Sequence, residues 1–228
     1  MNGAESLVRT LKLSGIDVCF TNPGTSEMHF MAALDRTDAL RCVLGLQENV
    51  VTGAADGYAR MAGKPAATLL HLGPGLANGL ANLHNANKAC TGIVNIVGDH
   101  ATYHIEVDAP LTADVEGIAR PVSDWVKTSP TSEGIAADGA EAVRQATTHP
   151  GRIATLILPA NTAWGEGSEP VAASIPNAPA PPDADKVEAA AKALSSGAAA
   201  ALYLKGNVLR EPGLTFAAKI AAKTGARL

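Results

Sequence analysis

Short apolar runs alternate with segments of helical periodicity through residues 3–162. The helical segments repeat apolar positions every three or four residues, as Leu7 and Leu11 do near the N-terminus. The apolar runs are nearly continuous, which is typical of parallel strands that are covered on both faces. We therefore expect buried strands at 16–20, 41–46, 66–72, 93–97, 122–127 and 153–158, and helices at 3–14, 26–34, 49–62, 76–88, 112–118 and 137–146.

This alternation predicts a doubly wound α/β domain over residues 1–164, with a mostly parallel sheet and helices on both of its faces. A linker is expected at 165–182, where prolines gather among Gly, Ser and Asn. Residues 183–228 then have a helix–strand–helix pattern, with the strand at 199–204. Because so short a unit cannot bury a full core, we expect it to be the beginning of a second, incomplete α/β domain.

Composition excludes several classes of function. The formal net charge is −4, no Lys/Arg cluster stands out, and aromatic residues make up only 4%, so a nucleic-acid-binding surface is not expected. The three cysteines lack the spacing of a disulfide framework or a zinc site, and Cys19 and Cys42 read as small core residues. The N-terminus has no signal-peptide pattern, and no apolar run approaches the ~20 residues of a membrane span. We expect a cytoplasmic protein that binds neither nucleic acid nor membrane.

Chemistry in a doubly wound fold gathers in the loops that follow the carboxyl ends of the strands. Asn22-Pro23-Gly24-Thr25-Ser26 follows the first expected strand, and by itself it reads as a tight turn before a helix. Glu48 follows the second expected strand, where a carboxylate commonly complements the dipole of the next helix. A poorly solvated carboxyl at this edge has a second use, since it can share a proton with a ring nitrogen.

The third strand-end loop contains His71-Leu72-Gly73-Pro74-Gly75-Leu76-Ala77-Asn78. A phosphate-binding GxGxxG pattern that starts at Gly73 requires glycine at position 78, where the chain has Asn78, and no GxxxxGK[ST] motif occurs. His71 has two readings, a satisfied and partly buried histidine, which is the commoner case, or a proton donor that faces a cleft.

Taken together and in this order, the three loops resemble the pyrimidine-binding domain of the thiamine-diphosphate-dependent decarboxylases and acetolactate synthases. The resemblance covers roughly residues 3–162, and 183–228 resembles the start of the family's central domain. Its strongest single piece is the Ala-Asp-Gly-Tyr-Ala-Arg run at 55–60, which follows Glu48. The other matching stretches are 15–24, 73–79 and the segment from Ala113-Asp114 to Arg120-Pro121.

The resemblance implies thiamine diphosphate as cofactor and assigns Glu48 to the glutamate that hydrogen-bonds its aminopyrimidine ring. Such a carboxyl favours the imino tautomer, whose exocyclic nitrogen can remove the thiazolium C2 proton. Glu48 and His71 are then the expected catalytic residues. The cofactor would be bound by Asn22, Pro23, Gly24, Glu48, Gly73 and Asn78, with Thr25, His71 and Leu111 on the substrate side and Pro110 beside Leu111 in an apolar wall.

The matching residues point to two different products. The Gly73-Pro74-Gly75-x-x-Asn78 pattern is similar to acetolactate synthases, which decarboxylate a 2-oxo acid and transfer the carbanion to a second carbonyl. His71, with the context Leu46-Gln47-Glu48, is more similar to benzoylformate decarboxylases, which release an aldehyde. We rank the acetolactate-synthase-like reading first, because the run around Gly73 favours it.

The same resemblance implies partners and further cofactors. The family binds Mg²⁺ and the diphosphate through a Gly-Asp-Gly…Asn motif in a C-terminal domain, and Gly98-Asp99-His100 is only its nearest counterpart here. The resemblance allows FAD as a further cofactor, but no feature of 183–228 supports it. Because the family builds each site from two subunits, a homodimer or tetramer is expected, and the 228-residue chain alone should be inactive.

Two other classes of function compete with this reading. One is a non-catalytic module that keeps the pyrimidine-domain fold and pairs with a partner chain. The other is an NAD-binding α/β protein, against which Gly79 counts, because it stands one position beyond the glycine that the motif requires. The sequence also shows no suitably placed acidic residue after that loop.

Overall fold

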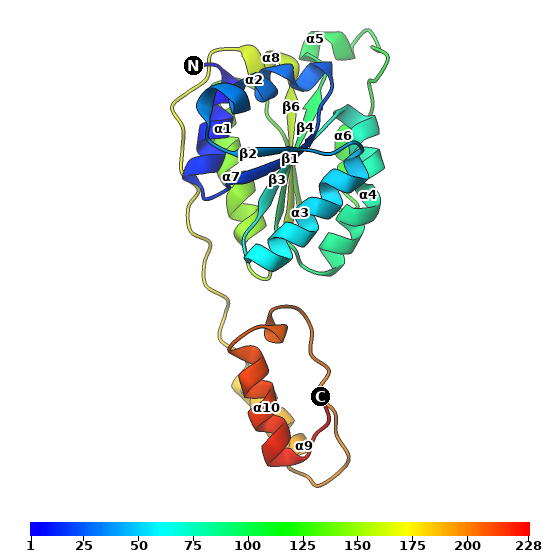
Figure 1. The fold of residues 1–228 in the computed structure, drawn as a ribbon, viewed down its shortest axis with the longest axis vertical. Coiled ribbons are helices and arrows are strands. Elements are labelled where there is room, and N and C mark those ends of the chain that lie inside the picture. Colours follow the sequence, from blue (N-terminus) through cyan, green and yellow to red (C-terminus); the bar gives the residue numbers. More distant parts are fainter. The chain divides into compact units, whose positions relative to one another are not determined.

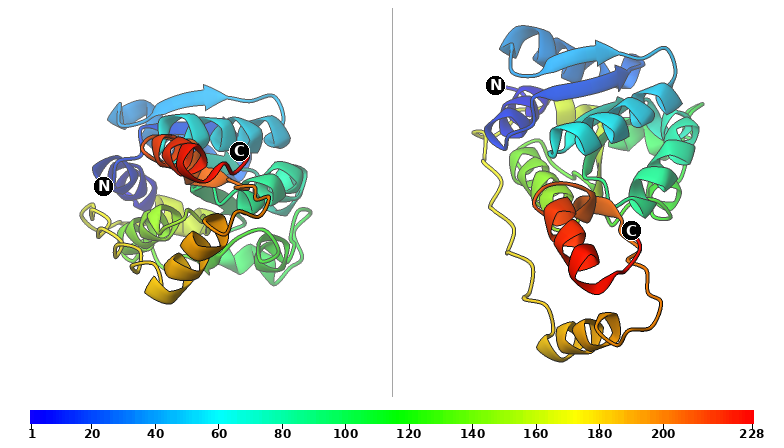
Figure 2. Two further views of the ribbon diagram at one scale, coloured as in Figure 1. Left: turned by 90° about the horizontal axis from the view of Figure 1, so that it is seen from below. Right: turned by 60° about the horizontal axis from the view of Figure 1, so that its bottom comes forward.

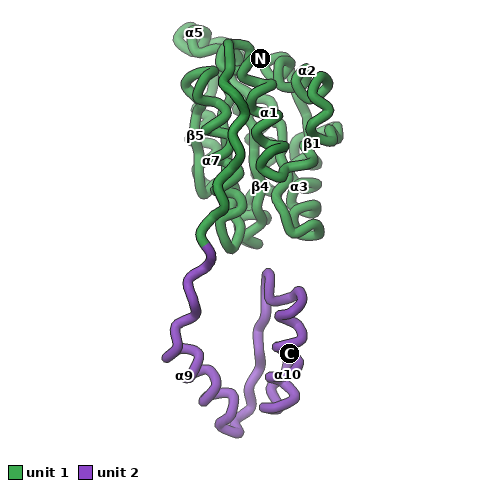
Figure 3. Tube along the Cα trace, turned by 90° about the vertical axis from the view of Figure 1, so that its left-hand side faces the viewer, with its two compact units in different colours: residues 1–177 green, residues 178–228 purple.

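A computed structural model describes residues 1–228 and divides them into two compact units, Met1–Asn177 and Ala178–Leu228 (Figure 3). The boundary between the units falls inside the segment predicted as a linker. The predicted domains at 1–164 and 183–228 remain predictions. No helix in the chain combines the length and apolar character that crossing a bilayer requires.

The first unit is built on a six-stranded sheet in which every neighbouring pair is parallel, in the order β2-β1-β3-β4-β6-β5 (Figure 1). The predicted α/β class is therefore confirmed. The central strands β3, β4 and β6 are buried along their whole length, as their continuous apolar runs predict. The strands are β1 (Val18–Asn22), β2 (Arg41–Leu44), β3 (Ala66–Leu70), β4 (Ile93–Asp99), β5 (Trp125–Thr128) and β6 (Ile153–Pro159).

Helices cover both faces of the sheet (Figure 2). One face packs against α1 (Gly3–Leu13), α2 (Met28–Thr37) and α7 (Ile135–Thr147). The other packs against α3 (Glu48–Ala62), α4 (Leu72–Lys88) and α6 (Val115–Ala119). Each face has its own apolar core, and short helices follow strand ends or loops: η1 (Thr25–Glu27), α5 (Thr102–Ile105) and α8 (Ala160–Trp164).

The second strand departs from its prediction. We expected a buried strand at 41–46, but β2 ends at Leu44 and most of it is exposed. Its place explains this, because β2 is an edge strand that pairs only with β1. Cys42 is consequently exposed rather than a core residue, whereas its neighbour in register, Cys19, is fully buried.

Three side-chain hydroxyls, two on α1 and one on its C-cap residue, form hydrogen bonds with the first part of the predicted linker. Ser6 Oγ donates to the carbonyl of Ser168 at 2.7 Å. Thr10 Oγ1 accepts from the amide of Val171 at 3.1 Å, and Ser14 Oγ accepts from the amide of Ala173 at 2.9 Å. The three hydroxyls are spaced four residues apart on one side of the helix. Residues 168–173 are therefore an extended strap along α1 and not a free linker.

Replacing Thr10 by valine should release the middle of this strap. The change keeps the volume of the buried side chain but leaves the Val171 amide without its acceptor, at a cost of about 1 kcal/mol. We expect faster amide hydrogen exchange at Val171. Thr147→Val is the control, because the Thr147 hydroxyl donates only to carbonyls of its own helix. Unchanged exchange at Val171 would show that the hydroxyl does not hold the strap.

The second unit contains α9 (Ala184–Leu194), the 3-10 helix η2 (Gly206–Leu209) and α10 (Gly213–Thr224). The strand predicted at 199–204 is wrong, since this segment forms only an isolated bridge between Ala201 and Arg227. A strand needs a neighbour along its length, and this unit supplies none. Among its hydrophobic side chains only Ala217 and Ala226 are buried, so the unit has little core of its own.

Candidate functional site

The candidate site lies between β1 and β3, where the order of the strands in the sheet reverses. After β1 the chain passes through α2 on one face to the edge strand β2, whereas after β3 it passes through α4 on the other face to β4. The loops that follow adjacent β1 and β3 therefore diverge, and in this fold class such a point is where a ligand crevice is expected, at the carboxyl ends of the two strands. Residues 22–27 and 71–75 meet at this point.

Glu48 enters this crevice from the first position of α3. Gln47 caps the helix, and its side-chain oxygen accepts hydrogen bonds from the amides of Asn49 and Val50. Glu48 is 8% exposed, and its Oε2 accepts a hydrogen bond from Asn78 Nδ2 at 3.0 Å. The other carboxyl oxygen, Oε1, makes no hydrogen bond with the protein. The carboxyl is thus held at one oxygen and available at the other.

Gly75 brings Glu48 and His71 close together. A Cβ at this position would lie 3.0 Å from Glu48 Oε1 and 3.3 Å from the Cβ of His71. The two side chains therefore flank the same point of α4. Gly75 leaves just enough room for both of them, and alanine would press on each.

The glycine-rich segment is helical, which corrects the helix start that we predicted at 76. Helix α4 begins at Leu72, so Gly73, Pro74 and Gly75 form its first turn. Proline is tolerated there because the amide that it lacks has no partner within the first turn. Leu72 itself is fully buried and has φ 51, a left-handed conformation that costs energy for a branched side chain.

His71 is fixed by an acid that the sequence analysis missed. Its Nδ1 lies 2.7 Å from Oε2 of Glu27, the last residue of η1. The amide of Gly24 donates to the same oxygen at 2.7 Å. A Cβ on Gly24 would fall 2.3 Å from the His71 ring, so the imidazole lies directly on the backbone of Gly24.

The Glu27 carboxyl has an unusual environment. Its residue is 2% exposed, and burial raises the pKa of the carboxyl above its ordinary value. The hydrogen bonds from Gly24 and His71 offset that rise only in part. Asp99, at the end of β4, is a second carboxyl at this edge whose pKa is raised by burial.

The remaining predicted residues take more peripheral places. Asn22 Nδ2 donates to the carbonyl of Gly45 at 2.9 Å and so holds the turn that precedes Glu48. Pro23 continues the turn after β1. Thr25 is exposed at the start of η1, and its hydroxyl makes no hydrogen bond to the other predicted residues.

The segment that contains Pro110 and Leu111 approaches the site through Gly73. A Cβ on Gly73 would lie 2.7 Å from the Cβ of Ala113, so this loop packs against the first turn of α4. Leu111 is 37% exposed, and Pro110 is exposed beside it. The structure therefore brings Gly24, Glu48, His71, Gly73 and Asn78 together, with Leu111 on a neighbouring loop.

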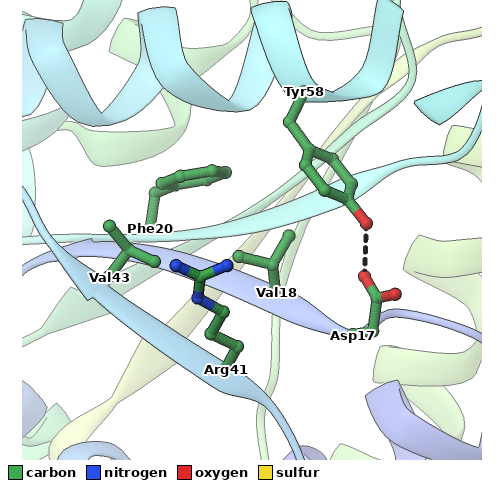
Figure 4. Close-up of a pocket in the computed structure, with 6 residues that line it drawn as sticks. All are labelled: Asp17, Val18, Phe20, Arg41, Val43 and Tyr58. Carbon is green, nitrogen blue, oxygen red and sulfur yellow. Dashed lines mark hydrogen bonds between the residues drawn. The ribbon is translucent and has the colours of Figure 1, made fainter. Parts of the chain in front are cut away.

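A separate hollow of about 430 Å³ opens between α3, the edge strand β2 and its neighbour β1 (Figure 4). Its floor is apolar, and the hydroxyl of Tyr58 on α3 donates to Asp17 at 2.5 Å. Lys64 also pairs with Asp17, and these two hydrogen bonds lower the pKa of the Asp17 carboxyl. Because Asp17 and Arg41 stand at the amino ends of their strands, this hollow is not part of the candidate site. Its lining residues are Asp17, Val18, Phe20, Arg41, Val43 and Tyr58.

The chain contains no group of three or more His, Cys, Asp or Glu side chains arranged to hold a metal ion. The protein groups available at the crevice are thus a free carboxyl oxygen on Glu48, a histidine bound to a buried acid, and backbone that glycines leave uncovered. This set suits the binding of a flat, nitrogen-containing ring and the transfer of protons beside it.

Comparison with known proteins agrees with this chemistry. Residues 1–118 match the family model described as thiamine pyrophosphate enzyme, N-terminal TPP binding domain. A Mycobacterium tuberculosis protein named "Putative acetolactate synthase large subunit" is 54% identical over 229 residues, which cover 100% of this chain and 44% of the relative. The benzoylformate decarboxylase of Pseudomonas aeruginosa is 30% identical over 150 residues, or 65% of this chain and 28% of the relative.

Among solved structures, the thiamine diphosphate-dependent 4-hydroxybenzoylformate decarboxylase of Rhodococcus jostii matches the fold with a TM-score of 0.76. The sequences are 23% identical, and the match covers 86% of this chain and 38% of that one. The chain therefore spans less than half the length of each of these relatives.

Proposed function

We propose, because this chain belongs to the thiamine pyrophosphate enzyme family, that it forms the pyrimidine half of the cofactor site of an acetolactate-synthase-like enzyme. Such an enzyme decarboxylates a 2-oxo acid and transfers the resulting carbanion to a second carbonyl. The observation that carries the proposal is Glu48, a nearly buried carboxyl that is anchored by Asn78 at one oxygen and unpaired at the other.

The residues present fit the aminopyrimidine ring of thiamine diphosphate. Glu48 Oε1 would exchange a proton with a ring nitrogen, while Asn78 keeps the carboxyl oriented through Oε2. Gly75 places no side chain between the carboxyl and His71, so a flat ring can approach both. When bound, the cofactor supplies the carbanion-stabilising chemistry, and the protein orients it and moves protons.

A second candidate function is favoured by one observation. His71 is hydrogen-bonded to the buried Glu27, which gives the site an ordered histidine beside Glu48. A proton donor at this place would protonate the carbanion and release an aldehyde, as a benzoylformate-decarboxylase-like enzyme does. We keep the carboligase first, since a relative that aligns with the whole chain bears an acetolactate synthase name.

A second copy of the chain is the proposed partner. The outer side of α3 carries an uncharged stripe of Val50, Ala54, Gly57 and Met61, which runs from the turn after Glu48 to the last turn of the helix. Val50 is 60% and Met61 is 83% exposed, so this stripe is a suitable contact surface in a homodimer or tetramer. Mg²⁺ and the diphosphate would then be held by a further domain of the longer protein.

The test is product analysis of the full-length protein with thiamine diphosphate and Mg²⁺, given pyruvate or benzoylformate. Acetolactate from pyruvate supports the carboligase, whereas benzaldehyde from benzoylformate supports the alternative. A full-length protein that turns over neither acid and does not bind thiamine diphosphate would instead be the non-catalytic module.

A further inference from the structure

Hydrogen bonds reach only one side of the Glu27 carboxyl. Oε2 receives the amide of Gly24 and lies against Nδ1 of His71, each at 2.7 Å. Oε1 is buried and has no hydrogen-bond partner. It lies over the backbone of Gly98 on β4, where a Cβ would be only 1.7 Å away. No lysine or arginine pairs with this carboxyl.

An ionised carboxyl is poorly accommodated in such a place. A buried charge is tolerated when its oxygens are paired, and here one oxygen faces only the protein backbone. A neutral acid avoids most of that cost and still accepts the Gly24 amide. Burial raises the pKa of Glu27, in agreement with this geometry.

His71 is held in a way that separates the functions of its two nitrogens. Nδ1 is engaged by Glu27, the ring rests on Gly24, and its Cβ lies beside Gly75. Nε2 makes no hydrogen bond with the protein, and the side chain is 23% exposed. Only Nε2 is therefore free to meet a molecule in the crevice.

We propose that Glu27 and His71 form one proton-carrying pair, in which a neutral Glu27 resupplies the ring when His71 gives up its Nε2 proton. As the N–H bond at Nε2 breaks and the proton goes to the bound molecule, the O–H bond at Oε2 breaks and an N–H bond forms at Nδ1. The ring stays neutral throughout, and the new carboxylate keeps the Gly24 hydrogen bond. Glu27 acts through His71 and is a positioning residue.

The identity of the proton acceptor rests on the proposed function, but the pair itself can be tested on the 228-residue chain without cofactor or substrate. Nitrogen-15 NMR of labelled histidine distinguishes a protonated Nε2 from a protonated Nδ1. We expect a neutral His71 ring to carry its proton on Nε2 while Glu27 holds its own proton, and to shift that proton to Nδ1 as rising pH ionises Glu27. The other five histidines serve as internal references.

Glu27→Gln sharpens the experiment, because its amide cannot ionise. An NH2 group placed toward Nδ1 donates to the ring but gives up the Gly24 hydrogen bond, whereas the amide oxygen in that place accepts from both partners. The tautomer of the neutral His71 ring in this variant should therefore not change with pH. A wild-type ring that, when neutral, carries its proton on Nδ1 at every pH, or an identical pH response in the variant, would overturn the proposal. Loss of thiamine binding in the full-length protein with the expected NMR result would instead count against the proposed function alone.

Thermal stability gives a second readout with a defined sign. Since the folded-state pKa of Glu27 lies above its ordinary value of 4.5, wild-type protein should lose stability as pH rises from that value through the raised pKa. Glu27→Gln escapes this loss, so its Tm should gain on the wild type with rising pH. Glu141→Gln is the control of opposite sign, because hydrogen bonds from Arg144 and Gln145 help to lower the pKa of Glu141. A Tm difference for Glu27→Gln that is independent of pH would contradict a neutral Glu27.

Discussion

Replacing Glu48 by glutamine should reduce exchange of the thiamine diphosphate C2 proton in the full-length protein by about 100- to 10,000-fold, the range for loss of a proton-transfer group. Glutamine has nearly the same shape and can still accept the Asn78 hydrogen bond, so the first turn of α3 should remain intact. What it cannot do is exchange a proton with the pyrimidine ring. Proton exchange followed by NMR measures that step directly, before any substrate is involved.

Asp56→Asn provides the matched control for this experiment. It lies on the same helix, removes the same unit of charge and breaks a surface ion pair with Arg60. Such exposed pairs contribute about 0–1 kcal/mol, so its C2 exchange should equal that of the wild type. Full exchange activity in Glu48→Gln, with its melting temperature unchanged, would remove Glu48 from the assigned role.

The sequence was most informative where burial is complete. The strands β3, β4 and β6 are buried on both faces, and their mostly apolar runs predicted them to within two residues at each end. Prediction failed where the presence of neighbouring strands, and not the residue pattern, decides whether a strand forms and is buried. The run at 41–46 is as apolar as an inner strand, yet its place at the sheet edge leaves it exposed. The run at 199–204 has no neighbouring strand with which to form a ladder.

The residues of the candidate site were also predictable only in part. Glu48 and His71 could be singled out because each follows a predicted strand, and Asn78 because the run around Gly73 resembles the family. Glu27 could not, because its partner His71 is 44 positions away and a glutamate near a helix start is ordinary in sequence. The one local signal is the spacing of Gly24 and Glu27, which allows a side chain to bind the amide three residues earlier. Gly98 carried no signal, since only the packed structure shows what lies above it.

Gly98→Ala should be the most damaging small substitution at the site. Its new Cβ would overlap Glu27 Oε1, at 1.7 Å, and Glu27 is only 2% exposed, so its carboxyl would have to leave a buried position. Glu27 must shift and break its contact with His71, or β4 must move. Overpacking of this kind costs about 1–3 kcal/mol. For a domain of this size, each kcal/mol corresponds to a fall of about 2–4 °C in Tm, which calorimetry can measure.

Gly57→Ala is the matched control, and its expected effect has the opposite sign. Gly57 lies within α3, and a Cβ there would meet no atom within 4 Å. Alanine in an unobstructed helical position stabilises by about 0.5–1 kcal/mol relative to glycine. The same added methyl group should therefore raise the Tm at 57 and lower it at 98. If both variants were stabilised, the close packing of Glu27 on Gly98, and with it the rigid hold on His71, would be refuted.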